Sequence, residues 1–220
     1  MLKKVVVFDC GIGGELFADY IENELAIIDV IRVIDWRHSP SDYKSPHFVR
    51  KTVAEILRPY LNQVDVIVFA NLFISLTCLD YFIHKYPSQK FSGFSFSTPP
   101  ASRGRRILIL STKSLHALPA YHLYKYRLRA KTSEFDCDEW LNLLSHGRLT
   151  LEHLKNDLIA ATSQFKPQQL YFTSTHLAKI KPMFRHVFGP TIKIEDGFLK
   201  AYRDLCGQLG LRGAKAGKRK

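Results

Sequence analysis

A carboxylic acid and a thiol stand next to each other at Asp9 and Cys10, directly before the glycine-rich segment Gly11-Ile12-Gly13-Gly14. They follow an apolar run with the composition of a buried strand, and a helical pattern begins near Glu15. Glycines at a strand-to-helix turn let the backbone approach a ligand, and the free N–H groups of the helix favour an anion. The segment therefore predicts a ligand-binding loop, although it matches neither the dinucleotide-binding nor the ATP-binding glycine motif.

Polar side chains follow other apolar runs in the same way. Asp35 and Asn71 end two such runs in the first half of the chain. Thr112 and the sequence Ser174-Thr175-His176 end two in the second half. Ligands bind at the carboxyl ends of parallel strands, so we expect a small polar or anionic ligand in a cleft between two lobes.

Short apolar runs alternate with longer stretches of helical periodicity, which predicts an α/β fold with mainly parallel sheets flanked by helices. The runs are rich in Val, Ile and Phe without polar alternation, as is typical of strands buried on both faces. The predicted strands are Lys3–Phe8, Val30–Ile34, Val64–Phe69, Phe91–Phe96, Arg106–Leu110, Gln169–Thr173 and Thr191–Ile194. The predicted helices are Glu15–Leu25, His47–Leu61, Phe73–Lys85, Leu115–Tyr126, Thr150–Ser163, Ala178–Val187 and Phe198–Leu209.

The segment Ser97–Gly104 is rich in turn-forming residues and separates two similar series of strands and helices. We therefore expect two pseudo-symmetric lobes, residues 1–97 and residues 98–196. Residues 197–210 are expected to form a C-terminal helix that packs back on the first lobe. Residues 211–220 combine glycines with basic residues and are expected to form a disordered tail.

The bulk composition is that of an ordinary globular protein, with 46% hydrophobic and 24% charged residues among 220. No apolar run approaches the roughly 18 residues of a membrane span, and the first residues do not resemble a signal peptide. Four cysteines lie far apart, which favours reduced thiols in a cytoplasmic protein over disulfides or zinc. The histidines show no ligand spacing, so we expect no metal and no cofactor.

The basic residues are unevenly distributed. Residues 212–220 hold five of them and no acid, so the rest of the chain carries +7 of the formal charge of +12. No Asp or Glu occurs between Tyr81 and Ser133, where ten Lys and Arg are found. The basic segment 103–131 and the tail could attract nucleic acid or another polyanion, and an ordinary basic surface is the alternative.

Several motifs together resemble those of glutamate racemases, members of the aspartate/glutamate racemase superfamily. The resemblance covers nearly the whole chain up to the tail, and the order and spacing of five motifs make it specific. The first motif, F-D-S-G-V/I-G-G, matches residues 8–14 except that Cys10 replaces the serine. The other motifs match Asp35 to Ser45, Phe69 to Ile74, Ser111 to Leu115 with Ala120-Tyr121, and Thr173 to Leu177.

The resemblance implies a substrate between two α/β lobes, with one cysteine thiolate on each face of the amino acid to remove and return the α-proton. It also implies D-amino acid chemistry of the kind that supplies peptidoglycan, and a homodimer is an open alternative. The two cysteine positions are Ala70 and Ser174 in this sequence. Alanine has no ionisable group, and a serine hydroxyl is weaker as an acid by about five pKa units or more, about 7 kcal/mol. Racemisation by the family's route is therefore expected to fail.

The positions that the resemblance assigns to substrate binding are partly changed. The family's Tyr-Gly after Pro40 has become Ser41-Asp42, where a carboxylate would repel an acidic amino acid, and a threonine has become Leu72. Five polar residues of the motifs remain, and they could still bind a small ligand: Asp9, Asn71, Thr112, Thr175 and His176.

Two alternatives remain open for the reactive groups. Cys10 could act as a nucleophile or single base, with Ser174 and His176, in an altered isomerase or hydrolase-like enzyme. Cys10 could instead be a small residue that fills the serine's place, and His176 a structural histidine. Cys137 falls where the family has a cysteine in its second lobe, whereas Cys78 and Cys206 have the spacing of helix core residues.

Overall fold

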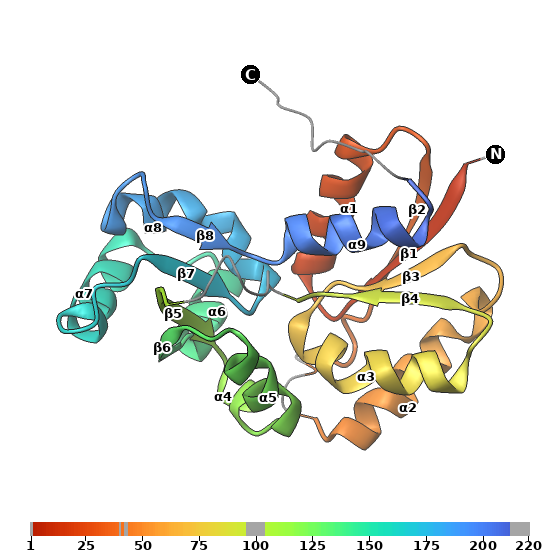
Figure 1. Cartoon of the computed structure of the whole chain (residues 1–220), viewed down its shortest axis with the longest axis horizontal. Helices are drawn as coiled ribbons and strands as arrows, with labels where there is room; N and C mark the ends of the chain where they lie inside the picture. Colours follow the sequence, from red (N-terminus) through yellow and green to blue (C-terminus); the bar gives the residue numbers. More distant parts are fainter. Residues whose placement is uncertain (1, 40, 42–43, 96–103, 212–220) are drawn as a thin grey trace. The chain divides into compact units, whose positions relative to one another are not determined.

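The computed structural model describes residues 2–39, 41, 44–95 and 104–211. The chain divides into two compact units (Figure 1): unit 1 comprises Met1–Ser95 with Phe198–Lys220, and unit 2 comprises Phe96–Gly197. Within the described residues each unit has one four-stranded sheet whose neighbouring strands all run parallel. The α/β fold predicted from the sequence is therefore confirmed.

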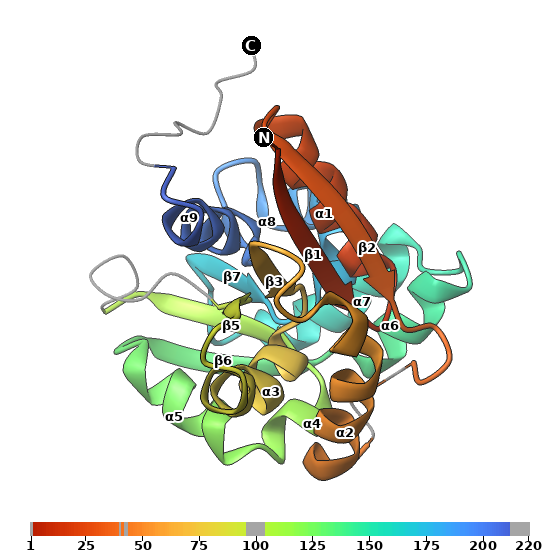
Figure 2. The ribbon, with the colours of Figure 1, turned by 90° about the vertical axis from the view of Figure 1, so that its right-hand side faces the viewer.

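The sheet of unit 1 has the strand order β2 (Ile28–Ile34), β1 (Lys3–Asp9), β3 (Val66–Phe69) and β4 (Lys90–Gly93). Strand β1 pairs with both β2 and β3, and Figure 2 shows β1 and β2 side by side. The central run Val5 to Phe8 is fully buried, as its apolar composition predicts. The edge strand β2 is only half-buried, so burial on both faces was wrongly predicted for it.

Four α-helices flank this sheet: α1 (Ile12–Glu24), α2 (Pro46–Leu57), α3 (Leu72–Lys85) and α9 (Phe198–Gln208). Helices α1 and α9 pack together on one face, and α2 and α3 on the other (Figure 1). Phe17 of α1 contacts Phe94 and Phe198 edge-on, with ring centroids 4.8 and 5.4 Å apart. The last helix therefore shares the core of unit 1 although it follows unit 2 in the sequence.

The sheet of unit 2 has the order β6 (Lys131–Asp136), β5 (Arg106–Ser111), β7 (Gln169–Phe172) and β8 (Lys193–Glu195). One core cluster joins β5 and β7 to three helices, α6 (Asp138–Ser145), α7 (Leu151–Thr162) and α8 (Lys181–Phe188). Trp140 of α6 is its largest side chain, and its indole N–H donates a hydrogen bond to Asp157 at 2.8 Å. Two further helices, α4 (Lys113–His116) and α5 (Pro119–Arg127), complete unit 2 with the 3-10 helix η3 (Thr175–Ile180).

Strand β6 and helix α6 are absent from the sequence predictions. The sequence of β6, K-T-S-E-F-D, has no apolar run because β6 is an edge strand whose residues are exposed or half-buried. Helix α6 has only eight residues, too few to show two clear turns of periodicity. The missing pair completes a sheet of the same strand count as that of unit 1.

Three predicted helices were wrong in extent. The helix predicted at Leu115–Tyr126 is divided into α4 and α5, because Pro119 starts a new helix at its first position. The helix predicted at His47–Leu61 ends at Leu57 and continues as the 3-10 turn η2 (Arg58–Tyr60), which contains Pro59. The segment Ala178–Val187 begins in η3 and becomes α8 at Lys181, before Pro182.

Several predicted strands were also misplaced by a few residues. Strand β3 begins at Val66 rather than Val64, and β4 spans Lys90–Gly93 rather than Phe91–Phe96. Strand β8 likewise starts at Lys193, two residues after the predicted start. Residues 96–103 and 212–220, which include most of the predicted break and nearly all of the predicted tail, lie outside the described residues.

Candidate functional site

The carboxyl ends of three neighbouring strands meet at one edge of the sheet of unit 1. The backbone N–H of Asp35, after β2, donates to the carbonyl of Asp9 at 2.9 Å. The N–H of Ala70, after β3, donates to the carbonyl of Phe8 at 2.8 Å. These bonds extend the parallel pairing by one residue on either side of β1. The structure therefore brings Asp9, Asp35 and Ala70 together, as the sequence predicts for one ligand-binding edge.

Asp9 and Cys10 form the turn from β1 into α1. Asp9 is fully buried, and its Oδ1 accepts a hydrogen bond from the backbone N–H of Cys10 at 2.6 Å. Cys10 is only 7% exposed. The glycines allow α1 to approach β1, because a Cβ on Gly14 would lie 2.6 Å from the Cβ of Asp9. The loop thus fixes a carboxylate and a thiol at the start of a 13-residue helix.

Asp35 holds the imidazole of His38, a contact that the sequence predictions missed. The Nδ1 of His38 lies 2.8 and 3.0 Å from the two carboxylate oxygens of Asp35, and the His38 backbone N–H donates to Oδ1 at 3.2 Å. The Asp35 side chain is buried, and that of His38 is 31% exposed. The only sequence signal for this contact is a histidine three residues after an acid. It lies at one of the variable positions of the motif that runs from Asp35 to Ser45.

The residues around Ala70 stabilise the fold. Ala70 is fully buried, and Leu72 is 2% exposed. The side chain of Asn71 caps α3 by accepting a hydrogen bond from the N–H of Ile74 at 3.2 Å. The carbonyl of Asn71 accepts from the hydroxyl of Ser75 at 2.6 Å. Asn71 therefore anchors the start of α3.

The carboxyl ends of β5 and β7 form the corresponding edge of unit 2. Thr112 follows β5 and is nearly buried, and its hydroxyl lies 2.9 Å from that of Ser114. After β7, Thr173 donates its hydroxyl to the carbonyl of Leu110 at 2.9 Å, which ties the two strands. Thr175 is 1% exposed, and its Oγ1 has no hydrogen-bond partner among the described residues.

Ser174 and His176 form a contact within this edge. The Oγ of Ser174 lies 3.3 Å from Nδ1 of His176, and Ser174 is 8% exposed. Burial lowers the pKa of His176, and the positive charge of Lys179 lowers it further. His176 is therefore neutral near pH 7, with a ring nitrogen able to accept a proton.

A second polar network of unit 2 was missed because β6 was missed. Glu134 of β6 accepts hydrogen bonds from the hydroxyl of Tyr121 and the ammonium of Lys125, both at 2.9 Å. The Nε2 of His116 lies 3.3 Å from Glu134 and 2.7 Å from the hydroxyl of Ser111. Burial raises the pKa of Glu134, but the hydrogen bonds from Lys125 and Tyr121 outweigh it and lower the pKa overall.

The other cysteines are core residues. Cys78 in α3 and Cys206 in α9 are buried, as predicted, and burial raises the pKa of Cys78 to about 12. Cys137 is fully buried in the core of unit 2 and lies 3.3 Å from the carbonyl of Ser111. Burial also raises the pKa of Cys206. These three thiols are structural.

Two predicted site residues, Pro40 and Asp42, lie outside the described residues. Their neighbour Ser41 is 4% exposed. Within the described part of the chain, no group of three or more His, Cys, Asp or Glu side chains is arranged to hold a metal ion. In the same part, no helix is both long and apolar enough to cross a membrane.

Two glutamate racemases are similar to this chain in sequence. The enzyme of Synechocystis sp. is 24% identical over 226 residues, which cover 97% of this chain and 80% of the relative. That of Gloeobacter violaceus is 25% identical over 211 residues, 92% of this chain and 79% of the relative. No family model matches the chain.

Among the solved structures, glutamate racemases share the fold of this chain. Glutamate racemase of Escherichia coli, in complex with L-glutamate and the activator UDP-MurNAc-Ala, superposes with a TM-score of 0.83 at 20% sequence identity. The match covers 100% of this chain and 86% of the bacterial enzyme. The fold that the motifs predict is therefore shared over the length of the chain.

Proposed function

We propose that this chain, which has the fold of the aspartate/glutamate racemase superfamily, no longer racemises amino acids and instead binds a small polar ligand. One observation carries the proposal: the side chain that follows β3 is the buried methyl group of Ala70. A methyl group neither accepts nor delivers a proton. Two-base racemisation needs a proton carrier on each face of the substrate, so the loss of one is sufficient to stop it.

The neighbours of Ala70 do not replace the missing base. The next side chain, Asn71, is not ionisable and caps α3, and Leu72 is apolar and buried. A second acid or base would have to come from another strand. No compensating change on β3 therefore supports a two-base mechanism.

Ser174 replaces the family's second cysteine, but its unreacted hydroxyl does not act as a base. Its hydroxyl lies 3.3 Å from a neutral His176, an arrangement that supports proton transfer during a reaction. A resting serine alkoxide would still cost about 7 kcal/mol relative to a thiolate. Direct removal of an α-proton by Ser174 is therefore not proposed.

The polar residues at the carboxyl ends of the two sheets support a ligand-binding role. Asp9 is buried beside the α1 turn, and Thr175 presents a buried hydroxyl without a described partner. A buried hydroxyl without a hydrogen bond is costly, and a bound polar group would satisfy it. Asp42 replaces the family's glycine, and a carboxylate that faced the ligand would repel an acidic amino acid. The proposed ligand is a small polar molecule other than glutamate, bound without a cofactor.

Exchange of the α-proton tests the loss of racemisation. The protein would be incubated with L- and D-glutamate and L- and D-aspartate in deuterium oxide, and loss of the α-proton signal would be followed by NMR. We expect no exchange above the rate without protein. Exchange with any of the four amino acids, removed by the S174A variant, would overturn the proposal. It follows from the proposal that the chain supplies no D-glutamate for peptidoglycan.

A second candidate, an altered enzyme of isomerase or hydrolase type, is favoured by the contact between Ser174 and His176. The neutral ring could take the hydroxyl proton as the serine attacks an electrophile. A serine-directed fluorophosphonate probe tests this candidate. Labelling of Ser174 that disappears in H176Q would support it, and the absence of labelling would exclude it.

A third candidate, polyanion binding, is favoured by a surface hollow of about 750 Å³ within the basic segment. Three cationic side chains line it, Lys125, Arg127 and Arg129, with Tyr126, which is 82% exposed. Exposed aromatic and basic side chains together suit single-stranded nucleic acid. A cytoplasmic location and a homodimer also stay predictions, which cell fractionation and light scattering would test.

A further inference from the structure

Helices α2 and α3 of unit 1, with the residues that directly follow them, line a hollow of about 320 Å³ whose side chains are strongly basic. This volume lies at the lower end of the range for small-molecule sites, about 300–1,000 Å³. Four of the lining side chains are cations and one is an acid, which gives a net charge of +3. The cations are Arg50, Lys51, Arg58 and Lys85, and the acid is Glu55. Such a lining favours a ligand with several negative charges.

The position of the cations on α2 is not favoured by the helix itself. Arg58 follows Lys51 by seven residues and Arg50 by eight, spacings that place side chains on one side of a helix. The first two turns of α2 contain no acid, and they hold Arg50 and Lys51. A helix dipole stabilises acids rather than cations near its start. The dipole of α2 therefore does not account for these cations, and an anion in the hollow would relieve the repulsion between them.

Arg50 is half-buried, and two contacts fix its guanidinium group. Its Nε donates a hydrogen bond to the carbonyl of Thr77 at 2.7 Å. Its Cζ lies 5.4 Å from the centre of the Tyr81 ring, a cation–π contact. The two terminal nitrogens form no hydrogen bond with the described residues. Arg50 therefore offers an oriented pair of donors that suits two oxygens of one anion.

Lys85 is held beside the same ring. Its ammonium group donates a hydrogen bond to the hydroxyl of Tyr81 at 2.9 Å, and it lies 5.2 Å from the centre of that ring and 5.5 Å from the centre of the Tyr86 ring. The hydrogen bond with Tyr81 raises the pKa of Lys85, so the group stays charged. Tyr81 thus positions two cations, Arg50 and Lys85, at one wall of the hollow.

We propose that this hollow binds a short polyphosphate chain, either inorganic or as the phosphate chain of a nucleotide. A single phosphate group carries about two negative charges at most near pH 7, fewer than the net charge of the lining. Linked phosphates reach several cations at once, and both the fork of Arg50 and the point charge of Lys85 suit phosphate oxygens. The adjoining hollow, which Arg50 and Lys85 also line, contains Asp80 and is less positive, so the chain is assigned to the first.

The site is separate from the strand-end edge of unit 1. Tyr81 and Lys85 lie in the last turns of α3, whereas Asn71 caps the start of that helix. The inference uses neither Ala70 nor Ser174. It is therefore independent of whether racemisation is lost and of which ligand binds at the strand ends.

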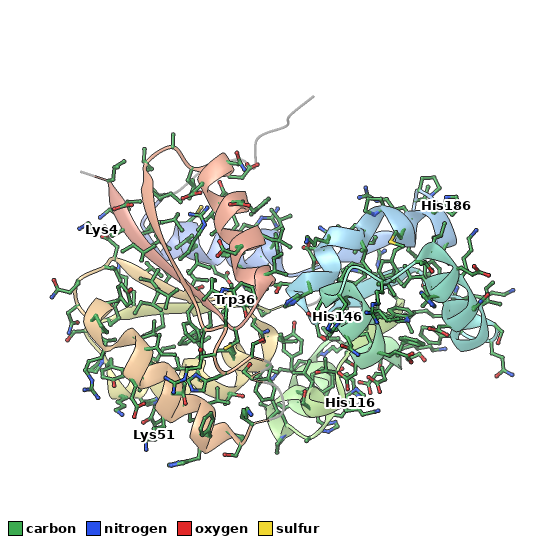
Figure 3. The ribbon with its side chains drawn as sticks, turned by 180° about the vertical axis from the view of Figure 1, so that it is seen from behind. Lys4, Trp36, Lys51, His116, His146 and His186 are labelled. Carbon is green, nitrogen blue, oxygen red and sulfur yellow. The ribbon has the colours of Figure 1, made fainter. Side chains whose placement is uncertain are left out.

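Binding of inorganic tripolyphosphate to the folded full chain tests the site. Calorimetric titration would use about 0.1 M sodium chloride without divalent metal ions, since charges more than about 10 Å away are then largely screened. The R50Q/K85Q variant is expected to weaken binding at least about tenfold. The control K4Q/R203Q removes one lysine and one arginine at exposed positions of unit 1, and Figure 3 shows Lys4 well apart from Lys51. It is expected to change the affinity less than about twofold.

Two further variants keep the test decisive if R50Q/K85Q does not fold. K51Q/R58Q removes two cations that form no hydrogen bond or ion pair in the described part of the chain, and it is expected to weaken binding at least about threefold. Y81F keeps the ring and the net charge but loses the hydroxyl that holds Lys85, and it is expected to weaken binding as well. Folded variants of the hollow that bind as tightly as K4Q/R203Q would overturn the proposal.

Other ligands identify the source of the phosphate chain. ATP that binds as tightly as tripolyphosphate, with no binding of adenosine, supports recognition of the chain alone. ATP that binds more tightly, with a loss in R50Q/K85Q, supports a nucleotide as the ligand. Citrate is expected to bind more weakly, because its three carboxylates are compact and do not extend along the hollow. Citrate that binds as tightly as tripolyphosphate would overturn the assignment to phosphate, and the absence of tripolyphosphate binding would overturn the site.

Discussion

Gly14 lies so close to Asp9 that the two residues leave no room for a further carbon atom between helix α1 and strand β1. A Cβ built on Gly14 meets the Asp9 Cβ at 2.6 Å and the Ile34 Cδ1 at 2.7 Å. Both contacts are shorter than real Cβ atoms tolerate. Glycine at position 14 of helix α1 is therefore required by the packing that presents Asp9 and Cys10, before any ligand is considered.

The first prediction is that Gly14→Ala destabilises the protein by about 1–3 kcal/mol, the cost of overpacking a rigid core. The matched control is Gly207→Ala in α9, where an added Cβ meets no atom within 4 Å. That substitution is expected to stabilise by about 0.5–1 kcal/mol, because alanine is the better helix former. Urea denaturation of both variants measures the difference, and equal midpoints would contradict it.

The second prediction concerns the lost proton carriers. If scaffold and ligand residues are retained, the double variant Ala70→Cys/Ser174→Cys should show α-proton exchange with at least one amino acid. Each single variant should exchange the α-proton of one enantiomer at most and should not interconvert the enantiomers, because delivery of the proton to the opposite face needs a carrier on both faces. The NMR deuterium assay, followed by chiral separation of the amino acids, measures all four proteins. Interconversion by the A70C variant alone would contradict the two-base account, and no exchange in the folded double variant would show that substrate binding has changed as well.

The third prediction follows from the burial of His176. The pKa of His176 in the folded state is lowered from its ordinary value of 6.5, so the unfolded chain binds more protons in the interval between the two. Stability therefore falls as the pH drops through that interval and levels off below the folded pKa. His176→Gln should remove this part of the acid destabilisation. Thermal transitions from pH 8 to pH 5 measure it. His146→Gln, at an exposed histidine of the same unit (Figure 3), controls for the loss of a histidine as such.

The elements that carry strong apolar runs could be predicted from the sequence. Strands β1, β3, β5 and β7 are central and buried, so their composition alone marks them. The residues after them, including Asp9, Asn71 and Thr112, are where strand ends predict them to be. Edge strand β6 is polar because one side of it meets solvent, and its sequence cannot be told from a loop.

The contacts that could not be predicted from the sequence all involve residues outside the apolar pattern. Glu134 gathers Tyr121, Lys125 and His116 only because β6 pairs with β5 in register. His38 reaches Asp35 through the turn of a loop, and no periodicity marks such a contact. The role of Asn71 was also open, because a strand-end amide can serve a ligand or cap a helix, and the structure shows the cap.

The last prediction concerns polyanion binding by the hollow at α5 and the start of β6. Replacing Tyr126, Arg127 and Arg129 by Ala, Gln and Gln should weaken retention on single-stranded DNA or heparin at low salt if this surface binds polyanions. Loss of two cations should lower the salt dependence of binding by about 1.4 in log–log slope for single strands. Lys125 is left unchanged because it hydrogen-bonds Glu134. The variant Arg148→Gln/Arg185→Gln removes the same charge elsewhere on unit 2 and should keep most of the binding. Equal losses in both variants would mean that net charge, rather than this surface, attracts the polyanion, and deletion of residues 212–220 would measure the share of the tail.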